Sequence, residues 1–158
     1  TQERGRRAGT ENLPGVAGLG AAIEAAVACR DADAPRIAAL RNRLEAGLLT
    51  ALPGAVVNGA GAPRLPGTLS LTIPGADAEA LLIALDLDGV CASAGSACHS
   101  GSAKPSSVLA AMGLTDAEAR ATLRLSLGWS STDEDVDRAL ELVPRLAARV
   151  RAAIPALG

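Results

Sequence analysis

The feature that most constrains the fold is a strict alternation of polar and apolar residues in two short segments. In Thr68–Ile73 and again in Thr122–Leu127, every second residue is aliphatic. Such alternation is typical of a strand that buries one face. The segments around them repeat their apolar residues every three or four positions, which is typical of helices. This combination predicts a two-layer α/β sandwich with a small, mostly antiparallel sheet.

Local signals place the other elements along the chain. Helices are expected over about 12–29, 34–52, 77–87, 106–112 and 133–153. Asp77 is expected to cap the third helix, and Ser131 with Glu134 resembles a capping box before the last, in which Pro144 should cause a kink. Gly89–Ser93 is expected to form a short buried strand.

Charge and composition argue against several partners. The 158 residues carry a net charge of −2 and lack a basic field, so nucleic acid and anionic membrane surfaces are not expected as partners. No run of about 18 apolar residues and no cleavable leader is evident, which favours a cytoplasmic protein. The chain begins at Thr1, so we expect a fragment or a processed chain. With Trp129 as the only aromatic residue, bases have no stacking platform.

Cys98 is the main candidate for chemistry. It lies in a Gly- and Ser-rich stretch, 93–105, which predicts a mobile loop and an exposed thiol, whereas free cysteine is usually buried. The alternative is an incidental surface thiol, with His99 an ordinary loop histidine. Cys29 and Cys91 lie among apolar residues and are expected to be buried and structural. The spacing of the cysteines fits neither a zinc site nor a disulfide framework, so no metal is expected.

Two further candidates are basic. Arg124 should project from the polar face of its strand, where a guanidinium can bind a carboxylate with two hydrogen bonds. The alternative is a solvated arginine. The segment Arg4–Thr10 leads into a helix, and backbone N–H groups, a hydroxyl and positive charge at such a place can bind phosphate. Arginines before helices are common, so this pattern alone has little specificity.

Four motifs occur together in one order. They are Arg7–Asn12 (RAGTEN), Arg64–Pro66 (RLP), Ser93–Cys98 (SAGSAC) followed by Pro105–Leu109 and Met112–Gly113, and Arg124–Gly128 (RLSLG). In this the chain resembles, over nearly its whole length, the group I (NifS/IscS-type) cysteine desulfurases of the class V aminotransferase family. The resemblance implies a pyridoxal-phosphate (PLP)-dependent transferase of fold type I, which is aspartate aminotransferase-like. Residues 1–30 would end the large cofactor-binding domain, and 31–158 would form the small C-terminal domain.

The resemblance also implies roles for single residues. Cys98 matches the nucleophile that takes sulfur from L-cysteine as a persulfide, leaving L-alanine. Arg124 matches the residue that binds the substrate carboxylate. Thr10 matches a threonine that contacts the cofactor phosphate of the other subunit, which implies a homodimer. The sulfur would pass to an acceptor such as an iron–sulfur scaffold or a tRNA-thiolation protein.

Departures from the family pattern leave alternatives open. Relatives often have Asn at the position of Gly67, and Trp129 stands where Arg is expected. The only lysine is Lys104, in the cysteine loop, so the Schiff-base lysine would have to precede Thr1 and this chain alone should be inactive. One alternative is a selenocysteine lyase or another class V enzyme, against which the Cys98 loop argues. The other is a catalytically silent module for dimerisation or partner docking.

Overall fold

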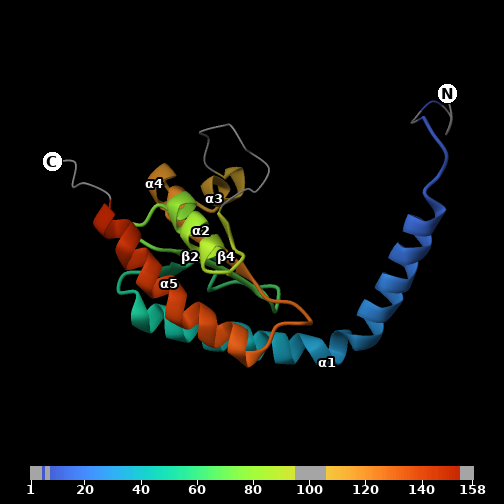
Figure 1. Cartoon of the computed structure of the whole chain (residues 1–158), viewed down its shortest axis with the longest axis horizontal. Coiled ribbons are helices and arrows are strands. Elements are labelled where there is room, and N and C mark those ends of the chain that lie inside the picture. Colours follow the sequence, from blue (N-terminus) through green and yellow to red (C-terminus); the bar gives the residue numbers. More distant parts are fainter. Residues whose placement is uncertain (1–4, 6–7, 95–105, 154–158) are drawn as a thin grey trace. The chain divides into compact units, whose positions relative to one another are not determined.

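The computed structural model of the chain describes residue 5, residues 8–94 and residues 106–153. By backbone contacts the chain divides into two compact units, Thr1–Ala34 and Pro35–Gly158. The boundary expected between residues 30 and 31 concerned the domains of a longer enzyme, and it stays a prediction. Figure 1 labels the elements. They are α1 (Leu13–Ala51), β1 (Val56–Val57), β2 (Thr68–Thr72), α2 (Ala78–Leu87), β3 (Ser93–Ala94), α3 (Ser107–Ala111), α4 (Asp116–Arg120), β4 (Thr122–Ser126) and α5 (Asp133–Ala153).

The second unit contains one antiparallel sheet with the strand order β1-β2-β4-β3. The two alternating segments form the central pair, in which Leu69 lies opposite Leu125 and Ser70 opposite Arg124. The leucines of this pair share one face and are at most 4% exposed. The polar residues share the other face, because successive side chains of a strand point to opposite sides. The predicted two-layer α/β sandwich with an antiparallel sheet is therefore confirmed.

Three helical segments cover the apolar face of the sheet. In Figure 1, α5 lies beside the part of α1 that belongs to the second unit, and α2 packs against α5. Leu44 and Leu48 from α1, Leu81 from α2 and Leu142 from α5 are each at most 2% exposed. Arg43 of α1 forms ion pairs with Asp133 and Asp137 of α5. The helices α1 and α5 approach closely at Gly47, where an added Cβ would lie 2.4 Å from a methyl group of Leu140.

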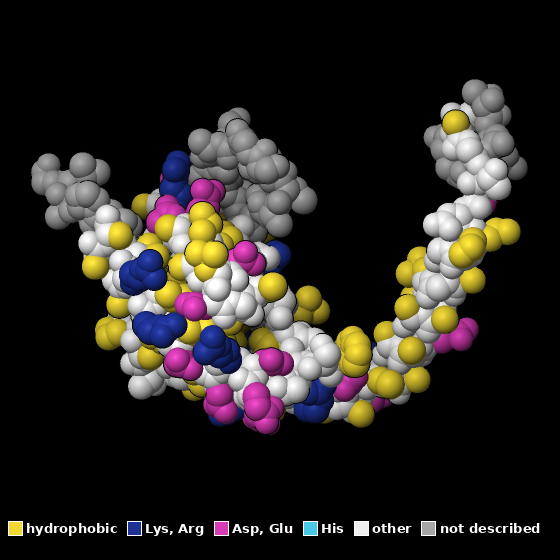
Figure 2. Space-filling model, in the orientation of Figure 1, with side chains coloured by type: hydrophobic (Ala, Val, Ile, Leu, Met, Phe, Trp, Pro, Cys, Tyr) yellow, Lys and Arg dark blue, Asp and Glu magenta, His cyan; other side chains and the backbone are white. Residues whose placement is uncertain are grey.

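The first unit contains the beginning of α1, and its apolar side chains are exposed. A stripe of five aliphatic residues, each 53–68% exposed, runs along the helix: Leu13, Val16, Leu19, Ile23 and Val27. Figure 2 shows hydrophobic side chains on the surface of this segment. By length and composition α1 could cross a membrane, since an 18-residue window reaches a mean hydropathy of 1.3. The expectation that no run approaches this length was wrong. The window owes its hydropathy to many Ala residues and few charged ones, and not mainly to large aliphatic residues.

Several local predictions also need correction. Instead of two helices there is one, and α1 continues through Pro35. The capping pair of α5 is Thr132 with Asp135, and not Ser131 with Glu134. The side chain of each accepts a hydrogen bond from the backbone N–H of the other.

The elements β1 and α4 were not predicted, although Thr115 and Glu118 form a complete capping box for α4. The helix after Asp77, the short helix after Ser106 and the helix ending at Ala153 are confirmed.

Candidate functional site

One row of polar side chains crosses the whole sheet on the face away from the leucines. Ser70 lies opposite Arg124 on one side, and Ser93 lies opposite Arg124 on the other. Asn58 directly follows β1, and its N–H donates to the carbonyl oxygen of Ser70 at 2.9 Å, which continues the β1–β2 register by one pair. We call Asn58, Ser70, Arg124 and Ser93 the transverse row. All four residues are partly buried.

Arg124 is the cation of the transverse row. Within residues 8–94 and 106–153, no hydrogen bond or ion pair of its guanidinium is formed. The prediction that this side chain leaves the sheet on its polar face is confirmed by the strand register. A half-buried guanidinium without a partner has five unused donors, and it can bind a planar anion with two parallel hydrogen bonds. Its role as the carboxylate-binding residue stays a prediction.

A hydrogen-bonded network lies next to the transverse row. The Asn58 Nδ2 atom donates to Ser70 Oγ at 3.2 Å and to Thr72 Oγ1 at 3.0 Å. The hydroxyl oxygens of Thr72 and Thr122 lie 2.8 Å apart, and Thr122 donates to the carbonyl oxygen of Glu118 at 2.7 Å. The network therefore joins β1, β2, β4 and the end of α4. A cavity of about 340 Å³ borders it, lined among others by Asn58 and Thr72.

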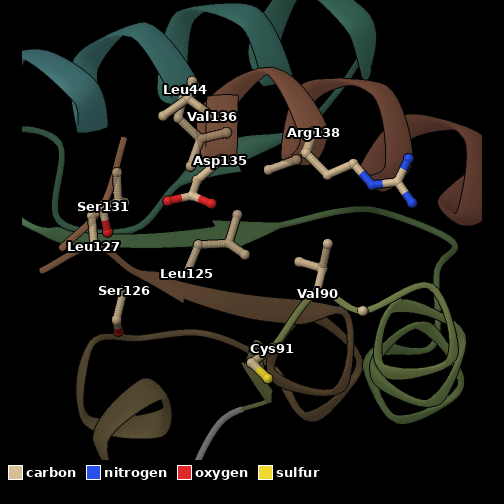
Figure 3. Close-up of a pocket in the computed structure, with 12 residues that line it drawn as sticks. Leu44, Val90, Cys91, Leu125, Ser126, Leu127, Ser131, Asp135, Val136 and Arg138 are labelled. Atoms are coloured by element: carbon tan, nitrogen blue, oxygen red, sulfur yellow. The ribbon is translucent and has the colours of Figure 1, made fainter. Parts of the chain in front are cut away.

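The predicted strand Gly89–Ser93 is much shorter than expected. Pairing with β4 begins only at Ser93, which lies opposite Arg124. A cavity of about 240 Å³ lies where the pairing would continue, between Val90–Cys91 and Leu125–Leu127. Figure 3 shows Cys91 and Ser126 in the lower part of this cavity and the Asp135 carboxylate in the upper part, while the Arg138 guanidinium extends away from them. The two segments do not pair there, so Leu125 and Ser126 of β4 have no strand beside them on this edge in the described structure.

The turn that follows β4 is held by two close contacts. Arg36 donates to the carbonyl oxygens of Trp129 at 2.6 Å and of Ser131 at 2.8 Å. At Gly67 an added Cβ would lie 2.2 Å from the carbonyl oxygen of Leu127. A side chain at position 67 would require the backbone of one of the two strands to shift there. The glycine that departs from the family pattern therefore has a local structural reason, whereas the Trp129 side chain is 79% exposed.

The other predicted site residues are either outside the transverse row or outside the described residues. Thr10 is exposed and precedes α1 in the first unit, whereas Arg124 belongs to the second. Cys98, His99 and Lys104 lie outside the described residues, as does most of the predicted cysteine loop. In the described residues no group of three His, Cys, Asp or Glu side chains could hold a metal.

The predictions for the other two cysteines were wrong. Cys29 and Cys91 are both exposed. Cys29 lies on the part of α1 whose side chains are all outside the core. Cys91 was expected within a buried strand, but the strand begins two residues later. The apolar neighbours that suggested burial are therefore not a reliable guide at either position.

The segment before α1 supports only one part of a pyridoxal-phosphate site. Gly9 has φ +89° and directly precedes Thr10, and the Asn12 side chain accepts a hydrogen bond from Gly15 N at 3.1 Å. The Thr10 hydroxyl fits a phosphate group, whereas the first-turn N–H groups of Leu13, Gly15 and Val16 already bond within this segment. The reactive ring would need a lysine, and Lys104 lies in the sequence of the cysteine loop. The described residues thus supply one hydroxyl for the phosphate end of this cofactor and do not complete its site.

Comparison with known proteins places this fold and sequence in a family. The aminotransferase class-V family matches residues 1–139, and the chain belongs to it. A cysteine desulfurase of Gluconacetobacter diazotrophicus is 46% identical over 98% of the chain and 38% of its own length. The cysteine desulfurase NifS of Azotobacter vinelandii is 43% identical over the same shares of both chains. The chain thus spans about 38% of the length of the curated relatives it matches.

Solved structures agree with this assignment. A NifS-like protein of Rickettsia africae has a TM-score of 0.79 and 32% identity, over 92% of this chain and 37% of its own. A second NifS-like protein has a TM-score of 0.75 and 32% identity, over 94% of this chain and 37% of its own. These comparisons confirm the resemblance to NifS-type proteins and the predicted fold class.

The sequence interpretation missed that Ser70 lies beside Arg124 and that Asn58 bonds to Ser70 and Thr72. Ser70 and Thr72 were recognised as polar positions of a strand, but their pairing partners were not known. The available signal was the identical alternation in the two segments, which makes their polar faces equivalent. Only the antiparallel register decides that Ser70, and not Thr68 or Thr72, lies opposite Arg124.

Proposed function

We propose that the complete protein to which this chain belongs is a cysteine desulfurase that forms a persulfide on Cys98. The observation that carries the proposal is Arg124, a half-buried cation in the middle of the polar sheet face that has no partner among the described residues. A substrate with a carboxylate, such as L-cysteine, supplies the planar anion that this guanidinium lacks. The proteins named cysteine desulfurase, which align along 98% of the chain, support the same activity.

The proposed reaction transfers one sulfur atom. The Cys98 thiolate attacks the sulfur of L-cysteine, and a bond between the two sulfurs forms while the substrate Cβ–Sγ bond breaks. The electron pair of the broken bond stays with the substrate carbon, which takes up a proton, so that L-alanine leaves. Atoms and electrons balance without any further oxidant. Arg124 would hold the carboxylate throughout and thereby fix the direction in which the substrate sulfur points.

The proposed cofactor is pyridoxal phosphate, and Thr10 is the residue of this chain that would contact its phosphate. When bound, its electron-withdrawing ring makes cleavage of the bond between Cβ and sulfur possible. The further proposals are a homodimer, in which Thr10 would serve the other subunit's cofactor, and a cytoplasmic location. The sulfur would pass to an acceptor protein such as an iron–sulfur scaffold.

Mass spectrometry after exposure to L-cysteine tests the proposal. The complete protein, loaded with pyridoxal phosphate, should gain one sulfur on the peptide that contains Cys98. Cys98→Ala should gain none, whereas the matched variants Cys91→Ala and Cys29→Ala should gain it as the wild type does. Arg124→Ala should raise the KM for L-cysteine by about tenfold or more, because a charge-assisted hydrogen bond is lost.

Two results would contradict the proposed function. The first is a cofactor-loaded wild type that neither gains sulfur nor releases L-alanine, which would favour a silent docking module. The second is an unchanged yield of L-alanine and sulfide from Cys98→Ala, which would remove the thiol from the mechanism.

A further inference from the structure

The position of Ser70 relative to Arg124 follows from the β2–β4 ladder. The backbone bonds at its two ends join Leu127 to Gly67 and Ile73 to Ala121, each at 2.8 Å. Hydrogen-bonded pairs alternate along an antiparallel ladder, so the pair Ser70–Arg124 is one without mutual backbone bonds. In such pairs the Cα atoms are only about 4.5 Å apart and the side chains are closer together. Ser70 is thus the near cross-strand neighbour of the Arg124 side chain.

The hydrogens of the network can be assigned by counting donors. Thr122 uses its only hydroxyl hydrogen on the Glu118 carbonyl oxygen, at 2.7 Å. The 2.8 Å contact with Thr72 therefore needs the hydrogen of Thr72, whose oxygen then accepts from Asn58 Nδ2 at 3.0 Å. Thr72 Oγ1 also lies 3.2 Å from Asn58 Oδ1, but its one hydrogen is already used. The network is thereby directed from Asn58 towards α4.

Ser70 ends the other branch of this network. Its oxygen accepts the second Nδ2 hydrogen of Asn58 at 3.2 Å, which leaves the Ser70 hydrogen to point elsewhere. Within the described residues no acceptor receives this hydrogen. Among the residues that the structure describes, a hydroxyl donor without an acceptor therefore lies beside a guanidinium without a partner, on the same face of the sheet. An anion with two oxygens satisfies both donors, and a carboxylate has this geometry.

We propose that Ser70 donates a hydrogen bond to the substrate carboxylate held by Arg124, and that Asn58 is the positioning residue that aims its hydrogen. This inference rests on the proposed function, because it deepens the carboxylate site of that reaction. Ser70 contacts the substrate, whereas Asn58 acts only through Ser70. Ser93 lies on the other side of Arg124, but no neighbouring amide orients its hydroxyl in the described structure.

Kinetics of the cofactor-loaded complete protein test the role of Ser70. Ser70→Ala should raise both the KM for L-cysteine and the inhibition constant of L-alanine, which carries the same carboxylate, by about tenfold. The kcat should change less than twofold, because the hydroxyl binds the carboxylate and not the sulfur. Ser70→Thr keeps the hydroxyl and should restore both constants to within about threefold of the wild type.

Thr68→Ala is the matched control. Thr68 lies on the same strand and the same face as Ser70, opposite Ser126, and its side chain takes no part in the network. This variant should leave both constants within twofold. Equal urea midpoints of Ser70→Ala and Thr68→Ala would establish that the two variants are equally stable.

A double-mutant cycle tests the positioning role of Asn58. Asn58→Asp replaces the donor by an acceptor, so the Ser70 hydrogen should turn from the substrate to the new carboxylate. The variant should raise the KM about as much as Ser70→Ala does, and the double variant should raise it no further. A larger rise in the double variant would mean that the new carboxylate acts by repelling the substrate, and it would overturn the role of Asn58.

The outcomes separate the two proposals. If the wild type forms no persulfide and no L-alanine, the proposed function fails and Ser70 has no such substrate. If the wild type is active but Ser70→Ala behaves as Thr68→Ala does, the proposed function stands and the role of Ser70 is wrong. A drop in kcat without a change in KM would also overturn it.

Discussion

The leucines in the core of the second unit are buried almost completely, whereas both leucines of the first unit are exposed. Leu48, Leu71 and Leu123 are 0% exposed, but Leu13 is 68% and Leu19 is 63% exposed. Both sets recur at regular spacings, so pattern alone does not distinguish them. The difference shows that Pro35–Ala153 contains both layers of its core, whereas the first unit contributes one apolar face and no opposite layer in the described residues.

Truncation of a leucine should change the stability of the two units most differently. Leu123→Ala should lower the free energy of unfolding by about 2 to 5 kcal/mol, because a fully buried side chain leaves a cavity. Leu19→Ala should change it by less than about 0.5 kcal/mol. Urea unfolding of the 158-residue chain measures both. Equal losses would contradict the contrast between the units.

Gly67→Ala should have the next largest effect. The added Cβ would lie 2.2 Å from the Leu127 carbonyl oxygen, so the backbone must shift and the loss should be about 1 to 3 kcal/mol. Gly61→Ala is the matched control in the same loop, since nothing lies within 4 Å of its added Cβ. Thermal unfolding compares the two. A neutral Gly67→Ala would mean that the strands can separate there without cost.

Arginine truncation should have a smaller effect and should depend on the unit. Arg36→Ala removes two hydrogen bonds to the turn at Trp129, and about 1 kcal/mol of stability should be lost. Arg30→Ala in the first unit removes only a pair with the adjacent, exposed Asp31 and should be nearly neutral. Because Trp129 is the only aromatic residue, fluorescence anisotropy reports the turn directly, and it should fall in Arg36→Ala alone.

Acidification should have the smallest effect, and it concerns the second unit. Hydrogen bonds from the backbone and then the side chain of Thr115 lower the pKa of Glu118. Because the folded-state pKa lies below the unfolded one, the cap of α4 stabilises the fold fully above the ordinary glutamate range and loses this contribution as the pH falls through the lowered pKa. An NMR titration of Glu118 measures this pKa. A value at or above 4.5 would contradict the capping box.

The sequence was sufficient where the structure depends on neighbours along the chain. The alternation in Thr68–Ile73, the cap at Asp77 and the acidic first turn of α5 are local, and each predicted its element. The continuity of α1 through Pro35 was not predictable, because proline ends some helices and only interrupts one hydrogen bond in others. The capping box of Thr115 and Glu118 was readable but was overlooked.

The candidate site was predictable only in part, for a different reason. Arg124 could be placed on a polar strand face because its own alternation decides that. Its neighbour Ser70 lies 54 positions earlier in the chain, and Asn58, the neighbour of Ser70, lies 66 positions earlier. Which of them meet depends on the register of three strands, and the sequence does not state this register. The assignment of Cys98 rests on the family resemblance.

The helix α1 continues without interruption across the boundary between the two units. Most domains are joined by exposed loops, which proteases cut readily. A helical backbone must first unwind locally before it fits a protease active site. Limited proteolysis should therefore not separate the two units as intact fragments. Pro35 removes the backbone bond that would reach the Asp31 carbonyl oxygen, so any cleavage that does occur between the units should begin in this turn.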